Sequence, residues 1–238
     1  MKKLLLSLLI SLPTLINAQP VDGFGKIKLG KTYDQLLSDI DVNPKKIVSS
    51  KNEKLSFSEV YRPRKATLVI YDSAHFQESL KYSYVMCESA KLLLLPSYKV
   101  SDIEVNNLEL KFFNDTLYSI QITNPTSDFT TAFKLKYGSG KTETEKKTVQ
   151  CSNALTGAGK FEVEEVAYTT TWSGEPDDIR AYSRLSDYRD SECKHQYISY
   201  YLISYDPTST IVSQCERATK DIIKKRTEAQ MKAKIKDF

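Results

Sequence analysis

The stretch GKIKLGKT, residues 25–32, matches the phosphate-loop pattern G-x-x-x-x-G-K-[ST] at every fixed position. Such a loop binds a nucleotide because its backbone amides curl around the phosphates after a buried parallel strand. Here residues 26–29 alternate Lys-Ile-Lys-Leu, a pattern typical of an extended strand with one wet face. Asp22 and Gly23 stand where the buried strand would be needed. The stretch therefore favours a short strand, and we expect no bound nucleotide.

A second group of reactive side chains is the acidic stretch GEPDD, in which Glu175, Asp177 and Asp178 follow one another closely. Close carboxylates can act as acid and base on a glycoside, or hold Ca²⁺. The stretch lacks the spacing of a calcium loop, whereas Gly, Pro and Asp are the residues that turns between strands require. We therefore expect an acidic turn.

Other catalytic and metal-binding patterns are missing from the sequence. No G-x-S-x-G motif marks a serine nucleophile. The two histidines, His75 and His195, both lie in polar surroundings, and no C-x-x-C pair supplies the closely spaced thiolates of a zinc site. The sequence thus predicts no catalytic residue, no metal and no cofactor, and it favours binding over catalysis.

Aromatic residues are concentrated between residues 172 and 205. Tyr200 and Tyr201 must point to opposite faces of one strand, so at least one face beyond the core carries a ring. Amphipathic rings of this kind suit recognition of a protein or a glycan. The alternative is that the rings pack beneath the C-terminal helix. The candidate binding residues are Trp172, Tyr182, Tyr200 and Tyr201.

The four cysteines predict two disulfides, because an even count is typical of an exported chain in an oxidising compartment. Cys151 and Cys193 both lie in polar stretches that flank the same run of strands, so we pair them. Cys87 and Cys215 then form the second bridge.

The first 18 residues have the order of a secretory signal peptide. Lys2 and Lys3 precede an apolar run, residues 4–16, and Ala18 offers a small residue for cleavage. The run is too short for a permanent transmembrane anchor, so we expect a periplasmic or secreted protein. Removing both lysines lowers the formal charge from +4 to +2, and a near-neutral chain gives no argument for nucleic acid as a partner.

Hydrophobic periodicity then predicts the elements that position these residues. Gly30 ends the first strand, and Thr32 with Gln35 forms a capping box for a helix. Residues 107–122 read as a hairpin that turns at Asn114-Asp115. A second helix, residues 129–137, ends at Gly138.

The rest of the chain is more polar. Residues 138–150 have no periodic pattern and are predicted to be a linker. Strands rich in Tyr, Thr, Val and Ile follow, and a helix begins near Ile211. Its apolar stripe is Ile211, Cys215, Ala218 and Ile222, and its far end is basic, with Lys224, Lys225, Arg226, Lys232, Lys234 and Lys236.

The predicted fold class is α+β, with two helix-plus-antiparallel-meander halves and a C-terminal helix. We expect a signal peptide at residues 1–18, a first half at 19–137, the linker at 138–150 and a second, β-rich half at 151–238. The stretch GKIKLGKTYDQLLSDI, residues 25–40, resembles the opening of small bacterial envelope domains of the outer-membrane assembly lipoprotein and β-lactamase-inhibitor-protein-like type. That resemblance implies a domain that binds other proteins.

The functional hypothesis is an exported, non-catalytic protein-binding or inhibitory module. The alternative is a glycan-binding or glycan-processing envelope protein, which the aromatic group and the acidic stretch motivate. For the basic C-terminal helix we expect a weak contact with an anionic surface.

Overall fold

The computed structural model describes residues 21–48, 62–71, 85, 87–152, 159–173 and 178–236. The predicted signal peptide at residues 1–18 lies outside this part, as do Glu175 and Asp177 of the acidic stretch. The described elements, in chain order, are β1 (Gly23–Phe24), β2 (Ile27–Lys28), α1 (Tyr33–Ile40), β3 (Lys45–Val48), β4 (Thr67–Ile70), β5 (Ala90–Val100), β6 (Ile103–Phe113), β7 (Thr116–Thr123), α3 (Ser127–Tyr137), β8 (Lys141–Ser152), β9 (Lys160–Ser173), β10 (Ile179–Arg189), β11 (His195–Tyr205) and α4 (Asp206–Lys236).

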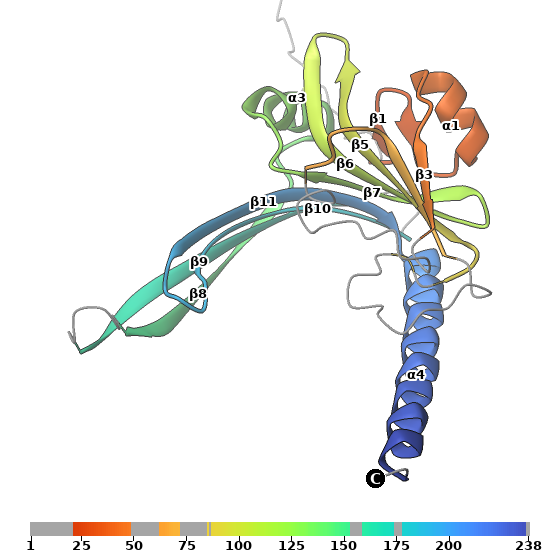
Figure 1. Cartoon of the computed structure of the whole chain (residues 1–238). Helices are drawn as coiled ribbons and strands as arrows, with labels where there is room; N and C mark the ends of the chain where they lie inside the picture. The colour runs from red at the N-terminus through yellow and green to blue at the C-terminus, as the bar shows by residue number, and fades with distance from the viewer. Residues whose placement is uncertain are drawn as a thin grey trace, which may run out of the picture.

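One sheet dominates the fold. Nine of the described strands pair in the order β3-β4-β5-β6-β7-β11-β10-β9-β8, and β1 and β2 form a separate two-stranded sheet. Every pair in the large sheet is antiparallel except β3 with β4. The α+β class is thus confirmed, with more strand than helix. β7 and β11 join the two expected halves into this one sheet (Figure 1).

The linker predicted for residues 138–150 is wrong. Lys141–Ser152 form β8, which pairs with β9 at twelve consecutive positions. The prediction failed because β8 is polar on both sides, so no hydrophobic alternation marks it. Its strand conformation is supported instead by β9 and by the tendency of threonine to occupy strands.

The N-terminal elements fold as the residue types predict. The Thr32 side chain accepts from the backbone of Gln35, and the Gln35 side chain accepts from the backbone of Thr32, which is the expected capping box of α1. The β6–β7 hairpin turns at Asn114 and Asp115, both in the left-handed region that short polar residues tolerate. Thr126 caps α3, and the α3 side chains Phe129, Phe133 and Tyr137 are buried.

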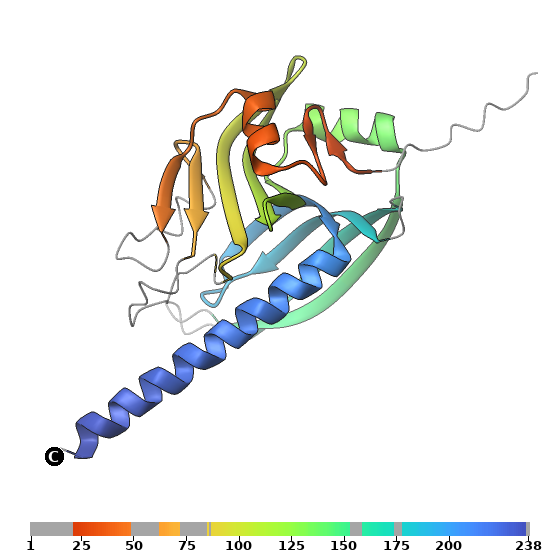
Figure 2. The same cartoon turned by 90° about the vertical axis from the view of Figure 1, so that its right-hand side faces the viewer.

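The two faces of the sheet carry different layers. We call the face covered by α1, α3 and the small sheet the helix face, and the opposite face the α4 face. On the helix face, Leu36 of α1 and Phe133 of α3 pack in one core cluster with Ile120 and Ile203. On the α4 face, Val212 of α4 belongs to a second cluster with buried residues of β4, β5 and β7. Figures 1 and 2 show that the C-terminal part of α4 extends beyond the sheet.

The C-terminal helix differs from the prediction in its start and its buried side. It begins at Asp206 rather than near Ile211. Val212 is buried, whereas Ile211 and Ile222 are about half exposed, at 50% and 52%. Ala218 is exposed as well, whereas Cys215 packs against the second cluster and bonds to Cys87. Most of the predicted stripe therefore faces solvent, because the helix docks only through its first turns.

Replacement of Ile203 by Ala tests the packing where β11 meets β7. Ile203 is 1% exposed and lies opposite Ile120, so the change should lower the free energy of unfolding by about 2–5 kcal/mol. Urea unfolding followed by the fluorescence of Trp172, the chain's one tryptophan, measures it. The matched control is Ile198→Ala on the same strand, where the side chain is 40% exposed and the loss should stay below about 1 kcal/mol. Equal losses for the two variants would contradict this packing.

Candidate binding surface

Two of the four candidate binding residues lie in the core. Trp172 and Tyr201 are each 4% exposed, and their rings stack with centroids 5.7 Å apart. Phe133 of α3 packs edge-on against both rings, and the Trp172 indole N–H donates to the carbonyl of Gly138 at 2.8 Å. These rings therefore pack beneath α3 on the helix face, and neither is available to a partner.

The other two candidates lie on the α4 face. Tyr182 of β10 and Tyr200 of β11 form an edge-to-face pair with centroids 5.9 Å apart, and both are partly exposed. Burial, reinforced by the hydrogen bond and the charge interaction with Tyr200, raises the pKa of Tyr182 to about 12. Alternation along β11 thus sends Tyr200 to the surface and Tyr201 to the core, as the sequence pattern requires.

The Tyr182–Tyr200 pair stands between two cavities. We call the first the inner cavity; it has a volume of about 320 Å³ and lies between the sheet and the start of α4. Its walls combine Tyr182 and other hydroxyl groups with charged side chains. The charged residues of the wall are Lys91, Lys111, Arg180, Asp206 and Glu216.

Ion pairs fix part of the inner cavity. Arg180 of β10 contacts Asp206, the first residue of α4, at 2.8 Å, and Lys91 pairs with Asp115. Deeper in the same face, the Gln121 side chain donates to the buried carboxylate of Glu109 at 3.3 Å. Burial raises the pKa of Glu109.

The outer cavity, of about 340 Å³, lies on the other side of the tyrosine pair. Tyr200 forms one wall and Tyr188 another, with Ile198, which is 40% exposed, beside them. Arg184 lines it as well, and its guanidinium contacts Glu145 of β8 at 3.2 Å. Tyrosine, arginine and one exposed aliphatic side chain thus share a single surface.

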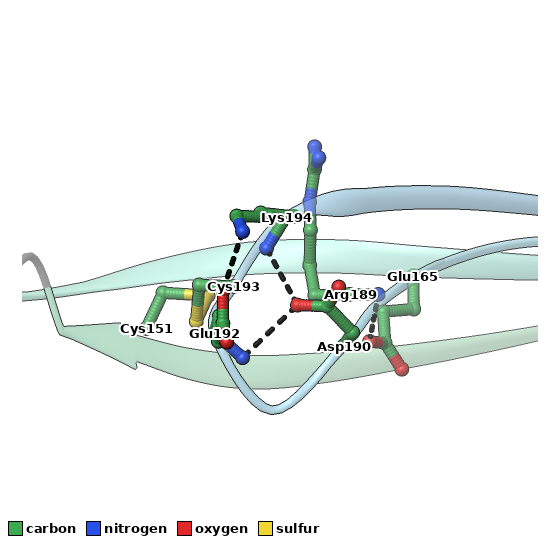
Figure 3. Close-up of a disulfide and its surroundings, with 7 residues drawn as sticks. All are labelled: Cys151, Glu165, Arg189, Asp190, Glu192, Cys193 and Lys194. Atoms are coloured by element: carbon green, nitrogen blue, oxygen red, sulfur yellow. Dashed lines mark hydrogen bonds and ion pairs between the residues drawn. A yellow bond between two sulfur atoms is a disulfide. The ribbon is translucent and has the colours of Figure 1, made fainter.

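A disulfide closes the far end of this surface. Cys151 lies on β8 and Cys193 in the turn between β10 and β11, so the bond spans the intervening strand β9. Figure 3 shows the turn lying against the strand that carries Cys151. The second bond joins Cys87, just before β5, to Cys215 of α4. Both predicted pairings are confirmed.

Hydrogen bonds hold the turn in this position. The Asp190 carboxylate accepts from the backbone N–H groups of Lys194 and Glu192, each at 2.9 Å (Figure 3). The backbone bond from Lys194 is the main cause that lowers the pKa of Asp190. Glu165 of β9 accepts from the backbone N–H of Arg189 at 2.7 Å, beyond the last β9–β10 pair. The turn is therefore fixed by side chains as well as by the disulfide.

The phosphate-loop match has a structural role. The amide of Gly30 donates to the carbonyl of Leu117, and the amide of Lys31 to that of Lys28. The Lys31 ammonium pairs with Asp39 of α1. Its hydrogen bond is the main cause that lowers the pKa of that carboxyl group. The stretch thus connects β2, α1 and β7 by bonds within the chain.

Searches for similar proteins give no family. No protein-family model, curated protein or solved structure matches the chain. Within the described residues, no group of three or more His, Cys, Asp or Glu side chains is placed to hold a metal ion. No described helix is long and apolar enough to cross a membrane.

Sequence reasoning overlooked the arginines of this surface. Arg180 and Arg184 share the parity of Tyr182 along β10, so they occupy the same face. That period of two was the available signal, and combining it with Tyr182 would have placed all three residues together.

The raised pKa of Tyr182 gives a pH prediction. The folded value of about 12 exceeds the ordinary value near 10, so the folded state favours the protonated phenol. Its contribution to stability is complete below about pH 10 and is lost as the pH rises towards about 12. NMR of chains carrying ¹³Cζ-labelled tyrosine, assigned with Tyr182→Phe, should show this titration, and Tyr200→Phe should move it part of the way down. Titration of Tyr182 near its ordinary pKa would contradict the buried pair.

Replacing Cys151 and Cys193 together by Ser should loosen the outer end of the surface. Loss of the bridge should lower the free energy of unfolding by about 2–4 kcal/mol, and amide exchange in residues 190–194 should speed up. Replacement of Cys87 and Cys215 is the control, because that bond fixes α4 and should leave exchange in residues 190–194 unchanged. Unaltered exchange after the first double replacement would show that the disulfide does not hold the turn.

Proposed function

We propose that this chain is an exported, non-catalytic protein-binding module that takes its partner on the α4 face, across the Tyr182–Tyr200 pair. The observation that carries the proposal is the placement of this pair between two cavities on one face. A partner that lies over the pair can insert side chains into both cavities. The rings then supply a central contact, with charged groups around it.

The residue types on this face favour a protein as the partner. Tyrosine and arginine are enriched at protein interfaces and among the residues that contribute most to binding. Arg180 and Arg184 flank Tyr182 on β10, and each contacts a carboxylate that keeps it in place. Partly exposed charges of this kind set specificity and association rate more than affinity.

Two covalent constraints support a preorganised surface. The Cys87–Cys215 bond fixes α4 at one end, and the Cys151–Cys193 bond fixes the β10–β11 turn at the other. A surface held in its bound shape loses less conformational entropy when a partner arrives. Two disulfides are also compatible with the proposed periplasmic or secreted location.

The exposed part of α4 adds a further feature to the proposal. Lys220, Lys224, Lys225 and Lys232 lie on this part of the helix, and all four are exposed. We assign to them a weak attraction for an anionic partner or surface, screened at physiological salt.

Variants of exposed tyrosines on opposite faces test the proposed surface. The double change Tyr182→Ala and Tyr200→Ala should weaken capture of the protein that the wild-type chain binds in envelope extract at least about tenfold. Central tyrosines at interfaces commonly contribute ~2 kcal/mol or more each to binding. The matched control is Tyr168→Ala with Tyr197→Ala, which removes rings that are 44% and 56% exposed on the helix face of β9 and β11. Partner bands are quantified by mass spectrometry, and the dissociation constant is then measured with the purified partner.

Three outcomes would count against the surface. These are equal capture by both double variants, stronger loss in the control pair, or no specific partner at native salt. A glycan array probed with the same proteins tests the alternative ligand class, and sugar binding lost only in the Tyr182/Tyr200 variant would replace the protein partner by a glycan.

A further inference from the structure

The edge of the sheet at β8 is long, regular and unpaired within the described part of the chain. β8 is the last strand of the sheet and pairs with β9 alone, at every position from Lys141 to Ser152 without a shift in register. It contains no proline and no glycine. The opposite edge strand, β3, has four residues. An edge of this kind presents a row of free backbone donors and acceptors to another strand.

Charged residues usually protect such an edge, but most charges of β8 are already compensated within the chain. Lys141 contacts Glu143 at 2.9 Å, Glu145 contacts Arg184 at 3.2 Å and Lys146 contacts Glu164 at 3.0 Å. Lys147 is the exception, since no described carboxylate lies within 4.0 Å of its ammonium group. The edge therefore carries little net repulsion and one cation that lacks a close counter-charge.

The sequence of β8 is complementary to itself. In an antiparallel pair of two copies centred on Lys146, Glu145 of each copy lies opposite Lys147 of the other on the α4 face. Thr144 lies opposite Thr148 on the helix face. Opposite charges and paired threonines are both favourable cross-strand neighbours. The central Lys146 residues face each other, but each is neutralised by Glu164 of its own chain.

Neighbouring registers are less favourable. Centring the pair on Glu145 places two glutamates opposite each other, and centring it on Lys147 does the same for two lysines. A shift by one residue would place side chains of opposite faces together, which an antiparallel pair does not allow. The register centred on Glu145 would also place Glu143 opposite Lys147, but only the register centred on Lys146 pairs Glu145 with Lys147 and Thr144 with Thr148.

From the free edge and this complementarity, we propose that β8 pairs with β8 of a second copy of this chain, in an antiparallel register centred on Lys146. The twofold axis stands perpendicular to the sheet, so both α4 faces point to the same side. Glu145 and Lys147 line the outer cavity, which places the two outer cavities on either side of the axis. The dimer offers two copies of the tyrosine pair in one direction, which would give avidity towards a clustered partner.

A charge swap tests the dimer and its register with the purified protein alone. Sedimentation equilibrium should show a monomer–dimer equilibrium for the wild type. Glu145→Lys and Lys147→Glu should each weaken dimerisation at least about fivefold, because each places like charges opposite one another twice in the interface. The double variant Glu145→Lys with Lys147→Glu restores opposite charges and should return the dissociation constant to within about threefold of the wild type.

Glu143→Lys is the control. Glu143 faces Val149 of the other copy in the proposed register, so this reversal should change the dissociation constant by less than about threefold. Circular dichroism confirms that each exposed variant remains folded. Three results would each overturn the proposal. The wild type could stay monomeric up to about 100 μM, neither single charge reversal could change the dissociation constant of the dimer, or the double variant could fail to restore it. The partner-capture result is separate, since a monomer can still bind through Tyr182 and Tyr200.

Discussion

The pairing of β7 with β11 is the constraint on which the rest of the structure depends. Five consecutive pairs, from Ser119–Ser204 to Thr123–Tyr200, connect the strands before α3 to those after it. Within this run, Ile120 and Ile203 lie opposite each other, both 1% exposed. Because this contact joins residues about eighty positions apart in sequence, the two sets of strands share one core, and α3 covers their junction. The α4 face exists as a continuous surface only because this pairing forms.

In the strands after α3, side chains alternate between the core on one face and the proposed binding surface on the other. Along β11, Tyr201 and Ile203 enter the core, while Tyr200 points to the opposite face. Beyond α3 no helix of the described residues covers these strands, and hydrogen bonds around Asp190 and the Cys151–Cys193 bond hold them together there. A surface supported in this way keeps its shape without burying the side chains that face a partner.

Local chemistry in the sequence predicted much of the fold. The Thr32–Gln35 capping box, the Asn114-Asp115 turn and the end of α3 at Gly138 each depend on residues close together in the chain, and all three are present. The pairing of cysteines also followed from the order of the strands. The sequence did not reveal β8, because a strand that is polar on both sides has no hydrophobic period. Predicting that Trp172 and Tyr201 are buried while Tyr182 and Tyr200 reach the surface required knowing that α3 covers one face of the sheet. That cover is a long-range contact. The arginines of the α4 face, by contrast, required no long-range contact, because their period of two with Tyr182 along β10 already places them on its face.

The most direct measurement of the proposed surface is amide hydrogen exchange of the chain, alone and bound to the partner that it captures. If the partner lies across the tyrosine pair, binding should slow exchange most in β10 and β11 and in the first turns of α4, while α1 and α3 remain unchanged. Protection confined to α1 and α3, with β10 and β11 unaffected, would contradict binding on the α4 face.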